Sequence, residues 1–211
     1  MIRRLFWDFD GTLYNSYPEV LRSFLKALDQ LGLHGLVSSE NAMRWLKKSV
    51  FEAASRCAAL AGTDVQLIMA AFAREHAADR EFAPYPHLRQ CLESLHEAGF
   101  SHYLYTHRDH LAIEKLQQDG LWRLFSDAVL RTDGFPDKPS PEALLALMAR
   151  NGLQPENCAM IGDRPIDVQA GRNAGMEGIL FDPEGYYADY PVALRFRDLS
   201  QLAGALMSQE Q

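Results

Sequence analysis

The sequence predicts an α/β protein: a doubly wound, mostly parallel β-sheet with an all-helical segment inserted after the first strand. Residues 2–9 form an apolar strand, and from residue 84 onward short apolar strands alternate with segments of helical periodicity. Strands that alternate with helices are typical of parallel βαβ units. Residues 18–84, by contrast, have helical periodicity and no convincing strand, and this indicates the insertion.

The helical segment is divided by its own start and stop signals. Glycine favours the position after a helix, whereas serine and threonine favour the position before one. Gly32 and Gly62 therefore end two helices, and Ser38-Ser39 and Thr63 begin two others. The expected helices are 18–32, 39–48, 50–61 and 64–80.

The rest of the chain repeats helix and strand. The expected helices are 86–98, 109–119, 141–151 and 166–174, and the expected strands are 102–105, 128–130, 158–161 and 178–181, with a closing strand and helix within 192–207. We therefore expect a core made of residues 1–14 and 85–211 and a helical unit made of residues 15–84. The expected hinges are Asn15-Ser16-Tyr17-Pro18 and Phe82-Ala83-Pro84-Tyr85-Pro86, where two prolines stiffen the return crossing.

Composition narrows the function classes. The 211 residues are 47% hydrophobic and 23% charged, which is ordinary for a globular protein. The formal net charge of -7 argues against nucleic acid as a main partner, since phosphate backbones attract an excess of Lys and Arg. No apolar run approaches the ~20 residues of a membrane span, and no signal peptide is recognised. Three scattered cysteines, without a CxxC pair, favour a reducing cytoplasm.

The most informative motif is the end of the first strand, Asp8-Phe9-Asp10-Gly11-Thr12. Alternate residues of a strand point to the same side, so Asp8 and Asp10 are expected to lie close together. Two close carboxylates repel, and a Mg²⁺ ion with oxygen ligands relieves that repulsion. An aspartate can also attack phosphorus. The alternative is an Asp-Gly hairpin turn, but a segment of helical periodicity at 19–31 follows, where a hairpin requires a second strand.

Polar residues follow two further expected strands. Thr106-His107-Arg108 follows residues 102–105, and Gly162-Asp163-Arg164-Pro165-Ile166-Asp167 follows residues 158–161. Lys138 lies before a helix, in Asp137-Lys138-Pro139-Ser140-Pro141. Ligands of open parallel sheets bind at the carboxyl ends of the strands. We therefore expect these clusters to converge on one edge, although each of them alone is explained as a turn or a helix start.

The order of these motifs and the position of the insertion resemble the haloacid dehalogenase (HAD) superfamily of hydrolases, in the type with a small helical cap after strand one. The resemblance covers nearly the whole chain. It implies that Asp8 is the nucleophile and Asp10 the general acid/base of phosphoryl transfer. It also implies a Mg²⁺ cofactor held by Asp8, Asp163 and the backbone carbonyl of Asp10, which would screen Asp8 from the phosphate.

The resemblance also implies roles for the other motifs. Thr106 would hydrogen-bond the phosphoryl oxygens, and Lys138 would balance the charge on the nucleophile and the transferring group. Asp167 would hold a metal-bound water or Lys138. His107 stands where close relatives often have Asn, which leaves open whether it contacts the phosphate or the substrate. Arg164 stands where many relatives have Ser or Thr, and its role stays open between screening the acidic cluster and touching substrate.

Substrate choice is expected to come from the helical cap. Its candidate polar residues are Arg44, Lys47, Lys48, Ser49 and Arg56, with Tyr14 and Tyr17 at the hinge. Lys48 is the main substrate-binding candidate, because Lys47-Lys48-Ser49 lies between two expected helices. Helix-surface lysines are more often simply solvated.

Taken together, these residues predict a Mg²⁺-dependent phosphatase that acts on a small phosphorylated metabolite through an aspartyl-phosphate, similar to phosphoglycolate phosphatases. A sugar-phosphate mutase of the same scaffold retains all four motifs and stays open as the alternative. Dehalogenation is disfavoured, because relatives of that type lack the second aspartate of the first motif. A regulatory protein without catalysis is disfavoured by the complete motifs.

Overall fold

The computed structural model describes residues 1–78 and 82–208, and the chain divides into two compact units. One unit is made of Met1–Tyr14 and Pro84–Gln211, and the other of Asn15–Ala83. Two short strands, β2 (Tyr14–Asn15) and β3 (Ala83–Pro84), pair where the chain passes between the units. The sequence did not predict them, because two residues are too few to show an alternating pattern.

The first unit is built on a six-stranded parallel sheet with the order β5-β4-β1-β6-β7-β8. The strands are β1 (Arg4–Trp7), β4 (Ser101–Tyr105), β5 (Phe125–Val129), β6 (Cys158–Gly162), β7 (Glu177–Phe181) and β8 (Leu194–Phe196). Trp7 of β1 is in register with Leu104 on one side and with Ile161 on the other. The predicted α/β class with a mostly parallel sheet is confirmed, and the carboxyl ends of β4, β1 and β6 meet at its centre.

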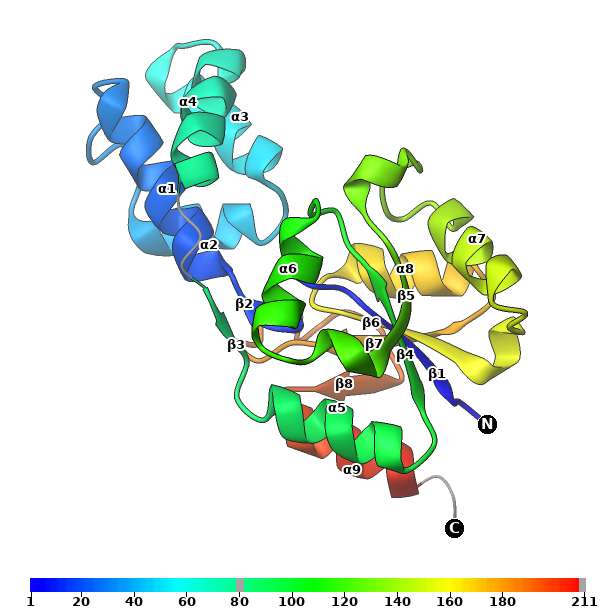
Figure 1. Ribbon diagram of the computed structural model, residues 1–211. Helices are drawn as coiled ribbons and strands as arrows, with labels where there is room; N and C mark the ends of the chain where they lie inside the picture. Colours follow the sequence, from blue (N-terminus) through cyan, green and yellow to red (C-terminus); the bar gives the residue numbers. More distant parts are fainter. Residues whose placement is uncertain (79–81, 209–211) are drawn as a thin grey trace. The chain divides into compact units, whose positions relative to one another are not determined.

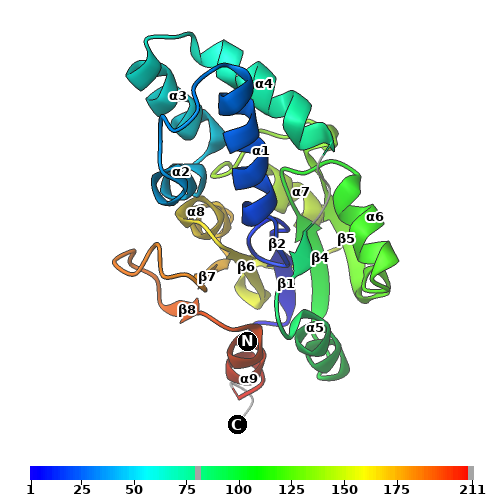
Figure 2. The ribbon, with the colours of Figure 1, turned by 90° about the vertical axis from the view of Figure 1, so that its left-hand side faces the viewer.

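Helices cover both faces of this sheet (Figures 1 and 2). The helices are α5 (Leu88–Glu97), α6 (Leu111–Gln118), α7 (Glu142–Arg150), α8 (Pro165–Asn173) and α9 (Leu199–Ser208), with short 3₁₀ turns at Trp122–Leu124, Arg131–Asp133 and Pro155–Asn157. Right-handed crossovers put α5 and α6 on one face and α7 and α8 on the other. The core under α7 and α8 includes Phe6, Tyr103, Leu144, Leu147 and Met160.

Some helices begin later than the sequence predicts. Expected helix 86–98 begins at Leu88, because His87 has a φ of 65° in the left-handed region and cannot belong to a right-handed helix. Expected helix 109–119 begins at Leu111, whose N–H is accepted by the Asp109 carboxylate at 3.0 Å. In both places the local backbone delays the helix by two residues.

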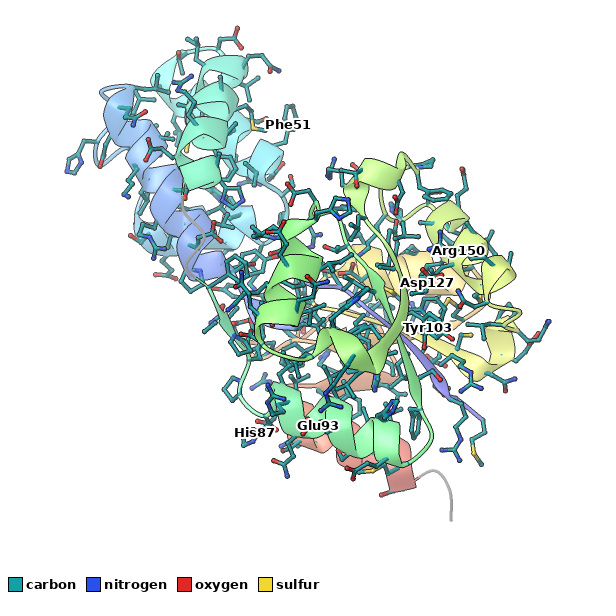
Figure 3. All side chains as sticks on the ribbon, viewed as in Figure 1. Phe51, His87, Glu93, Tyr103, Asp127 and Arg150 are labelled. Carbon is teal, nitrogen blue, oxygen red and sulfur yellow. The ribbon has the colours of Figure 1, made fainter. Side chains whose placement is uncertain are left out.

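Strand β5 begins earlier than the expected strand at 128–130. Its position at the edge of the sheet explains why the sequence did not reveal its first residues. It begins at Phe125 and includes Asp127. The Asp127 carboxylate accepts hydrogen bonds from Arg150 Nε and Asn151 Nδ2, both at 2.8 Å (Figure 3). An edge strand can keep such polar side chains toward solvent, so it lacks the continuous apolar run that marks a central strand.

His102 of β4 is a fully buried polar residue in the sheet. Its Nδ1 accepts a hydrogen bond from Trp7 Nε1 at 3.0 Å, and its Nε2 lies 3.1 Å from the backbone carbonyl of Leu92. A neutral ring that carries its proton on Nε2 satisfies both contacts. Burial lowers the pKa of His102 to about 4, although the bond to the Leu92 carbonyl opposes this shift. The imidazole is therefore a neutral structural group at physiological pH.

The second unit is helical, with α1 (Tyr17–Gln30), α2 (Ser39–Leu46), α3 (Val50–Ala61) and α4 (Val65–Ala78). Ser49 Oγ accepts the Glu52 N–H at 2.9 Å and so caps α3, and Gly62 ends it with a φ of 63°. Phe51 on α3 stays 56% exposed and points outward from the helix (Figure 3). Expected helices 18–32, 39–48 and 50–61 are present within a few residues.

The start of α4 differs from the prediction. Thr63 was expected to cap it, but Asp64 is the residue whose carboxylate accepts the N–H of Gln66, at 2.9 Å. Aspartate is at least as favourable as threonine at this position. The end of the expected helix, at residue 80, lies outside the described residues. Among the residues that are described, none of the helices has the length and apolar character needed to cross a bilayer.

Candidate active site

Three buried carboxylates meet at the carboxyl edge of the sheet. Asp8 directly follows β1, Asp163 directly follows β6, and Asp167 lies in the first turn of α8. Each offers one oxygen, and the three oxygens lie within 4.8 Å of one another. Burial raises the pKa of Asp8 to about 7, with Lys138 opposing the shift and Asp167 adding to it. The sequence prediction that these distant motifs converge agrees with this arrangement.

Lys138 is the cation of this cluster. Its buried Nζ lies 2.9 Å from Asp8 Oδ1 and 2.8 Å from Asp167 Oδ1, and it donates to the backbone carbonyl of Tyr105 at 3.0 Å. Burial alone would lower the pKa of Lys138, but the two carboxylates outweigh it and the pKa is raised. Lys138 also lowers the pKa of Asp167, although burial of that carboxyl works in the opposite direction. The structure therefore places an ammonium ion between two aspartates.

A glycine allows Asp167 to reach this position. Asp167 Oδ2 accepts the backbone N–H of Arg164 at 3.0 Å at the start of α8. The Asp167 side chain lies directly over Gly162, where an added Cβ would stand 2.2 Å from Asp167 Cβ. No real side-chain atom tolerates so close a contact, so the absence of a side chain at Gly162 is what makes room for Asp167.

Asp10 pairs with an arginine and is not one of the three clustered carboxylates. Its carboxylate accepts hydrogen bonds from Arg108 Nε at 3.1 and 3.0 Å and from Arg108 Nη2 at 2.6 Å. The sequence predicts Asp8 and Asp10 on one side of the strand end, and it places Arg108 in the polar cluster after β4 without assigning it a role. The available signal was its place two residues after Thr106, at the same edge of the sheet. Paired in this way, the Asp10 carboxylate has a fixed orientation.

Thr106 and His107 follow β4, the strand that pairs with β1. Thr106 is buried, and its Oγ1 accepts the backbone N–H of Arg108 at 3.0 Å. His107 Nε2 accepts the backbone N–H of Lys138 at 3.1 Å. Burial, helped by the charge of Lys138, lowers the pKa of His107 to about 4. Arg164, the residue left open by the sequence, has its Nε 3.8 Å from Asp163 Oδ1 and thus provides a positive charge beside the acidic cluster.

The candidates of the helical unit differ strongly in burial. Lys48, the substrate-binding candidate from the sequence, is exposed, whereas Lys47 is buried with its Nζ 3.7 Å from the centre of the Tyr17 ring. Arg44 and Arg56 form ion pairs one turn away on their own helices, with Glu40 at 3.1 Å and Glu52 at 2.7 Å. Such pairs are typical of solvated helix faces. At the hinge, the Tyr14 hydroxyl donates to Asp119 at 2.6 Å.

The acidic cluster fits a hard divalent cation. Asp8 Oδ2 is buried and has no hydrogen-bond partner within the described part of the chain. The donor atoms offered by Asp8, Asp163 and Asp167 are all carboxylate oxygens, the ligands that Mg²⁺ and Ca²⁺ prefer. Three carboxylates also outnumber the ammonium group of Lys138, so a further positive charge would be stabilised here.

Comparison with known proteins agrees with this fold. The family model of the haloacid dehalogenase-like hydrolases matches residues 5–181. A phosphoglycolate phosphatase of Aliivibrio fischeri is 32% identical over 186 residues, which cover 82% of this chain and 81% of that protein.

Two crystal structures share the fold. The first, of a predicted phosphoglycolate phosphatase from Haemophilus somnus, has a TM-score of 0.80 at 21% identity, covering 97% of this chain and 98% of that one. The second, of a predicted β-phosphoglucomutase from Thermotoga maritima, has a TM-score of 0.74 at 17% identity, covering 98% and 99%. At such identities the two structures show the fold alone, whereas the family model covers most of the sequence. The chain belongs to the family of haloacid dehalogenase-like hydrolases.

Proposed function

We propose that this protein is a Mg²⁺-dependent phosphatase that hydrolyses a small phosphate monoester through an aspartyl-phosphate on Asp8. The observation that carries the proposal is the environment of Asp8. Lys138 holds one carboxylate oxygen at 2.9 Å, and the other oxygen is buried with no hydrogen-bond partner among the described residues. A carboxylate fixed by one oxygen, with the other available, is arranged as a nucleophile.

The first half of the reaction forms the aspartyl-phosphate. A carboxylate oxygen of Asp8 attacks phosphorus, and the bond from phosphorus to the ester oxygen breaks. Asp10, protonated for this step, gives its proton to the departing alkoxide. The Thr106 hydroxyl holds an oxygen of the transferring phosphoryl group. The ammonium charge of Lys138, whose N–H groups point to Asp8, Asp167 and the Tyr105 carbonyl, offsets the negative charge that the phosphoryl oxygens carry.

The second half releases phosphate. Asp10, now a carboxylate, accepts a proton from a water molecule whose oxygen attacks phosphorus. The bond from Asp8 to phosphorus breaks, which restores the Asp8 carboxylate and yields inorganic phosphate. Asp10 is protonated again for the next substrate. While Asp10 is a carboxylate, its orientation is set by the three hydrogen bonds from Arg108.

The Mg²⁺ ion would be held by Asp8, Asp163 and the backbone carbonyl of Asp10. Asp167 would not bind the ion directly but would position Lys138, whose Nζ lies 2.8 Å from Asp167 Oδ1. When bound, the ion supplies positive charge that lowers the repulsion between the Asp8 carboxylate and the anionic substrate. The buried, all-oxygen donor set supports this proposal.

The substrate class we propose is a small organic phosphate, with 2-phosphoglycolate as the first compound to test. Its support is the relative named a phosphoglycolate phosphatase, with which this chain shares 32% identity. The test measures inorganic phosphate release from 2-phosphoglycolate, glycerol phosphates, hexose phosphates and p-nitrophenyl phosphate, each with Mg²⁺. Asp8→Asn is the control, because it keeps the shape of Asp8 and removes the attacking charge. Its turnover is expected to fall by several orders of magnitude with the fold intact.

The same experiment distinguishes a phosphatase from a mutase. A mutase holds a sugar hydroxyl where a phosphatase admits water, so both form the aspartyl-phosphate. Stoichiometric phosphate release supports the phosphatase. Rapid interconversion of isomeric hexose phosphates with only trace phosphate would replace it by the mutase. Near-normal turnover in a folded Asp8→Asn sample would exclude both.

A further inference from the structure

His107 contacts the loop that carries Lys138. The ring nitrogen Nε2 lies 3.1 Å from the backbone nitrogen of Lys138, which can only donate. The carboxylate of Asp137 is farther from the same ring nitrogen, at 3.6 Å. A backbone N–H requires an acceptor, so the shorter contact decides the protonation of the ring: Nε2 carries a lone pair, and the proton of the neutral imidazole is on Nδ1.

The backbone of His107 is part of the same connection. Its carbonyl accepts a hydrogen bond from Arg131 Nε at 2.8 Å, and Arg131 Nη2 lies 3.5 Å from Asp137 Oδ1. His107 follows β4, Arg131 lies in the 3₁₀ turn after β5, and Asp137 directly precedes Lys138. These contacts join three loops into one network around the backbone of Lys138.

We propose that His107 is a positioning residue for Lys138: its neutral imidazole, as the Nδ1–H tautomer, accepts the Lys138 backbone N–H and fixes the loop that delivers the ammonium group to Asp8 and Asp167. The consequence for turnover rests on the proposed function of Lys138. The hydrogen bonding of the His107 ring does not depend on that function, and it can be tested by itself. This role differs from the direct contact with phosphate or substrate that the sequence left open for His107.

The charges around the ring are consistent with a neutral acceptor. His107 is largely buried, and its pKa is lowered to about 4 by that burial and by Lys138. Arg131 and Arg164 lower the pKa further, while Asp137 raises it. At neutral pH the ring therefore lacks the second proton that would remove its acceptor.

Two amide variants separate the positioning role from a substrate contact. Glutamine extends its amide to about the position of Nε2, whereas asparagine extends its amide only to the position of Nδ1. If His107 positions Lys138, His107→Gln keeps kcat within a few-fold of wild type. His107→Asn then lowers kcat by roughly tenfold to a hundredfold with little change in KM, because a small misplacement of a catalytic group has effects of that size.

The opposite pattern would overturn the proposal. If His107→Asn keeps full activity and His107→Gln raises KM with kcat unchanged, the residue contacts the substrate through the Nδ1 side. Equal and small effects of both variants on kcat would also overturn it. Both rates are measured with p-nitrophenyl phosphate and with the best ester of the panel, on samples with matched circular dichroism and Tm.

The tautomer of His107 can be measured without an activity assay. In a long-range ¹H–¹⁵N correlation spectrum of the full chain at neutral pH, His107 should show a protonated Nδ1 and an unprotonated Nε2. Its signal is assigned by its absence from His107→Gln. A protonated Nε2, or a ring doubly protonated at pH 7, would refute the proposal even if the protein is an active phosphatase. If no ester is hydrolysed, the proposed function fails, and the spectrum still decides the role of the ring.

Discussion

His102 should make the stability of this protein depend on pH in a way that one substitution removes. The ring is fully buried between Trp7 Nε1 and the Leu92 carbonyl, and its pKa is lowered from 6.5 to about 4. In the unfolded chain the same histidine takes up a proton at its ordinary pKa. The unfolded state therefore binds more protons between these two values, and stability falls as pH decreases from 6.5 toward 4.

The size of the effect follows from the shift. The lowered pKa of His102 corresponds to about 3 kcal/mol of the free energy of unfolding. Roughly 2 kcal/mol of this contribution is lost between pH 7 and pH 5. His102→Gln retains amide groups that can hydrogen-bond but do not titrate. The variant is expected to be less stable than wild type at pH 7 by about 1–3 kcal/mol, since the amide cannot meet both partners as well as the ring does.

The assay is urea unfolding of wild type and His102→Gln at several pH values between 7 and 5, in the presence of a chelator. The difference between the two proteins cancels other titrations, including the opposite contribution of Asp8, whose raised pKa favours the folded state at lower pH. The stability difference should shift by roughly 2 kcal/mol in favour of the variant as pH falls to 5. A difference that stays constant across this range would refute the assignment of His102 as a neutral buried ring.

Three further outcomes are expected. Gly162→Ala places a Cβ against the Asp167 side chain and should displace it. We expect a lower Tm by calorimetry and a lower kcat for phosphate release. Wild-type values of both would contradict the packing argument. Arg108→Gln removes the hydrogen bonds that orient Asp10. The loss of kcat/KM should therefore be larger for an alkyl phosphate, whose alkoxide needs a proton, than for p-nitrophenyl phosphate. An equal loss for both esters would argue against Arg108 as the residue that orients Asp10. Excess chelator should abolish phosphate release, Mg²⁺ should restore it, and Ca²⁺ should restore it poorly because its coordination shell is larger and looser; full activity in chelator would exclude a metal role.

The sequence predicted those features that depend on local pattern and on strand order. Asp8, Thr106 and Asp163 each follow an apolar run, and parallel strands bring their carboxyl ends to one edge whatever the packing details. The order of strands and helices along the chain could be predicted because it too depends on local pattern. Edge strand β5 was partly missed, because Asp127 on its polar side interrupts the apolar run.

Side-chain partners from distant parts of the chain were not predictable. The pairing of Arg108 with Asp10 and of His107 with Lys138 depends on which rotamers meet across the sheet edge, and no periodicity records that. The burial of Lys47 beside an exposed Lys48 depends on how the end of α2 packs against Tyr17. In each case a single residue type allows several partners, and only the folded structure selects one.

The strand order also has a consequence for how the chain folds. β1 is the first strand of the sequence, yet its register partners are Ser101 and Cys158. Closing such long loops costs entropy before any pairing compensates for it, and chains dominated by distant pairings fold slowly. The helical unit, made of the consecutive residues Asn15–Ala83, has no such delay.

We therefore expect β1 to leave the ribosome before the strands it pairs with and to find both of them only later. Until β6 has been synthesised, the apolar side chains of Leu5, Phe6 and Trp7 have no complete sheet to cover them, and Asp8 lacks Asp163 and Asp167. The carboxylate cluster at the sheet edge is then assembled only when the C-terminal half of the core arrives, so truncated chains that end before β6 should carry a folded helical unit and an unassembled, aggregation-prone core.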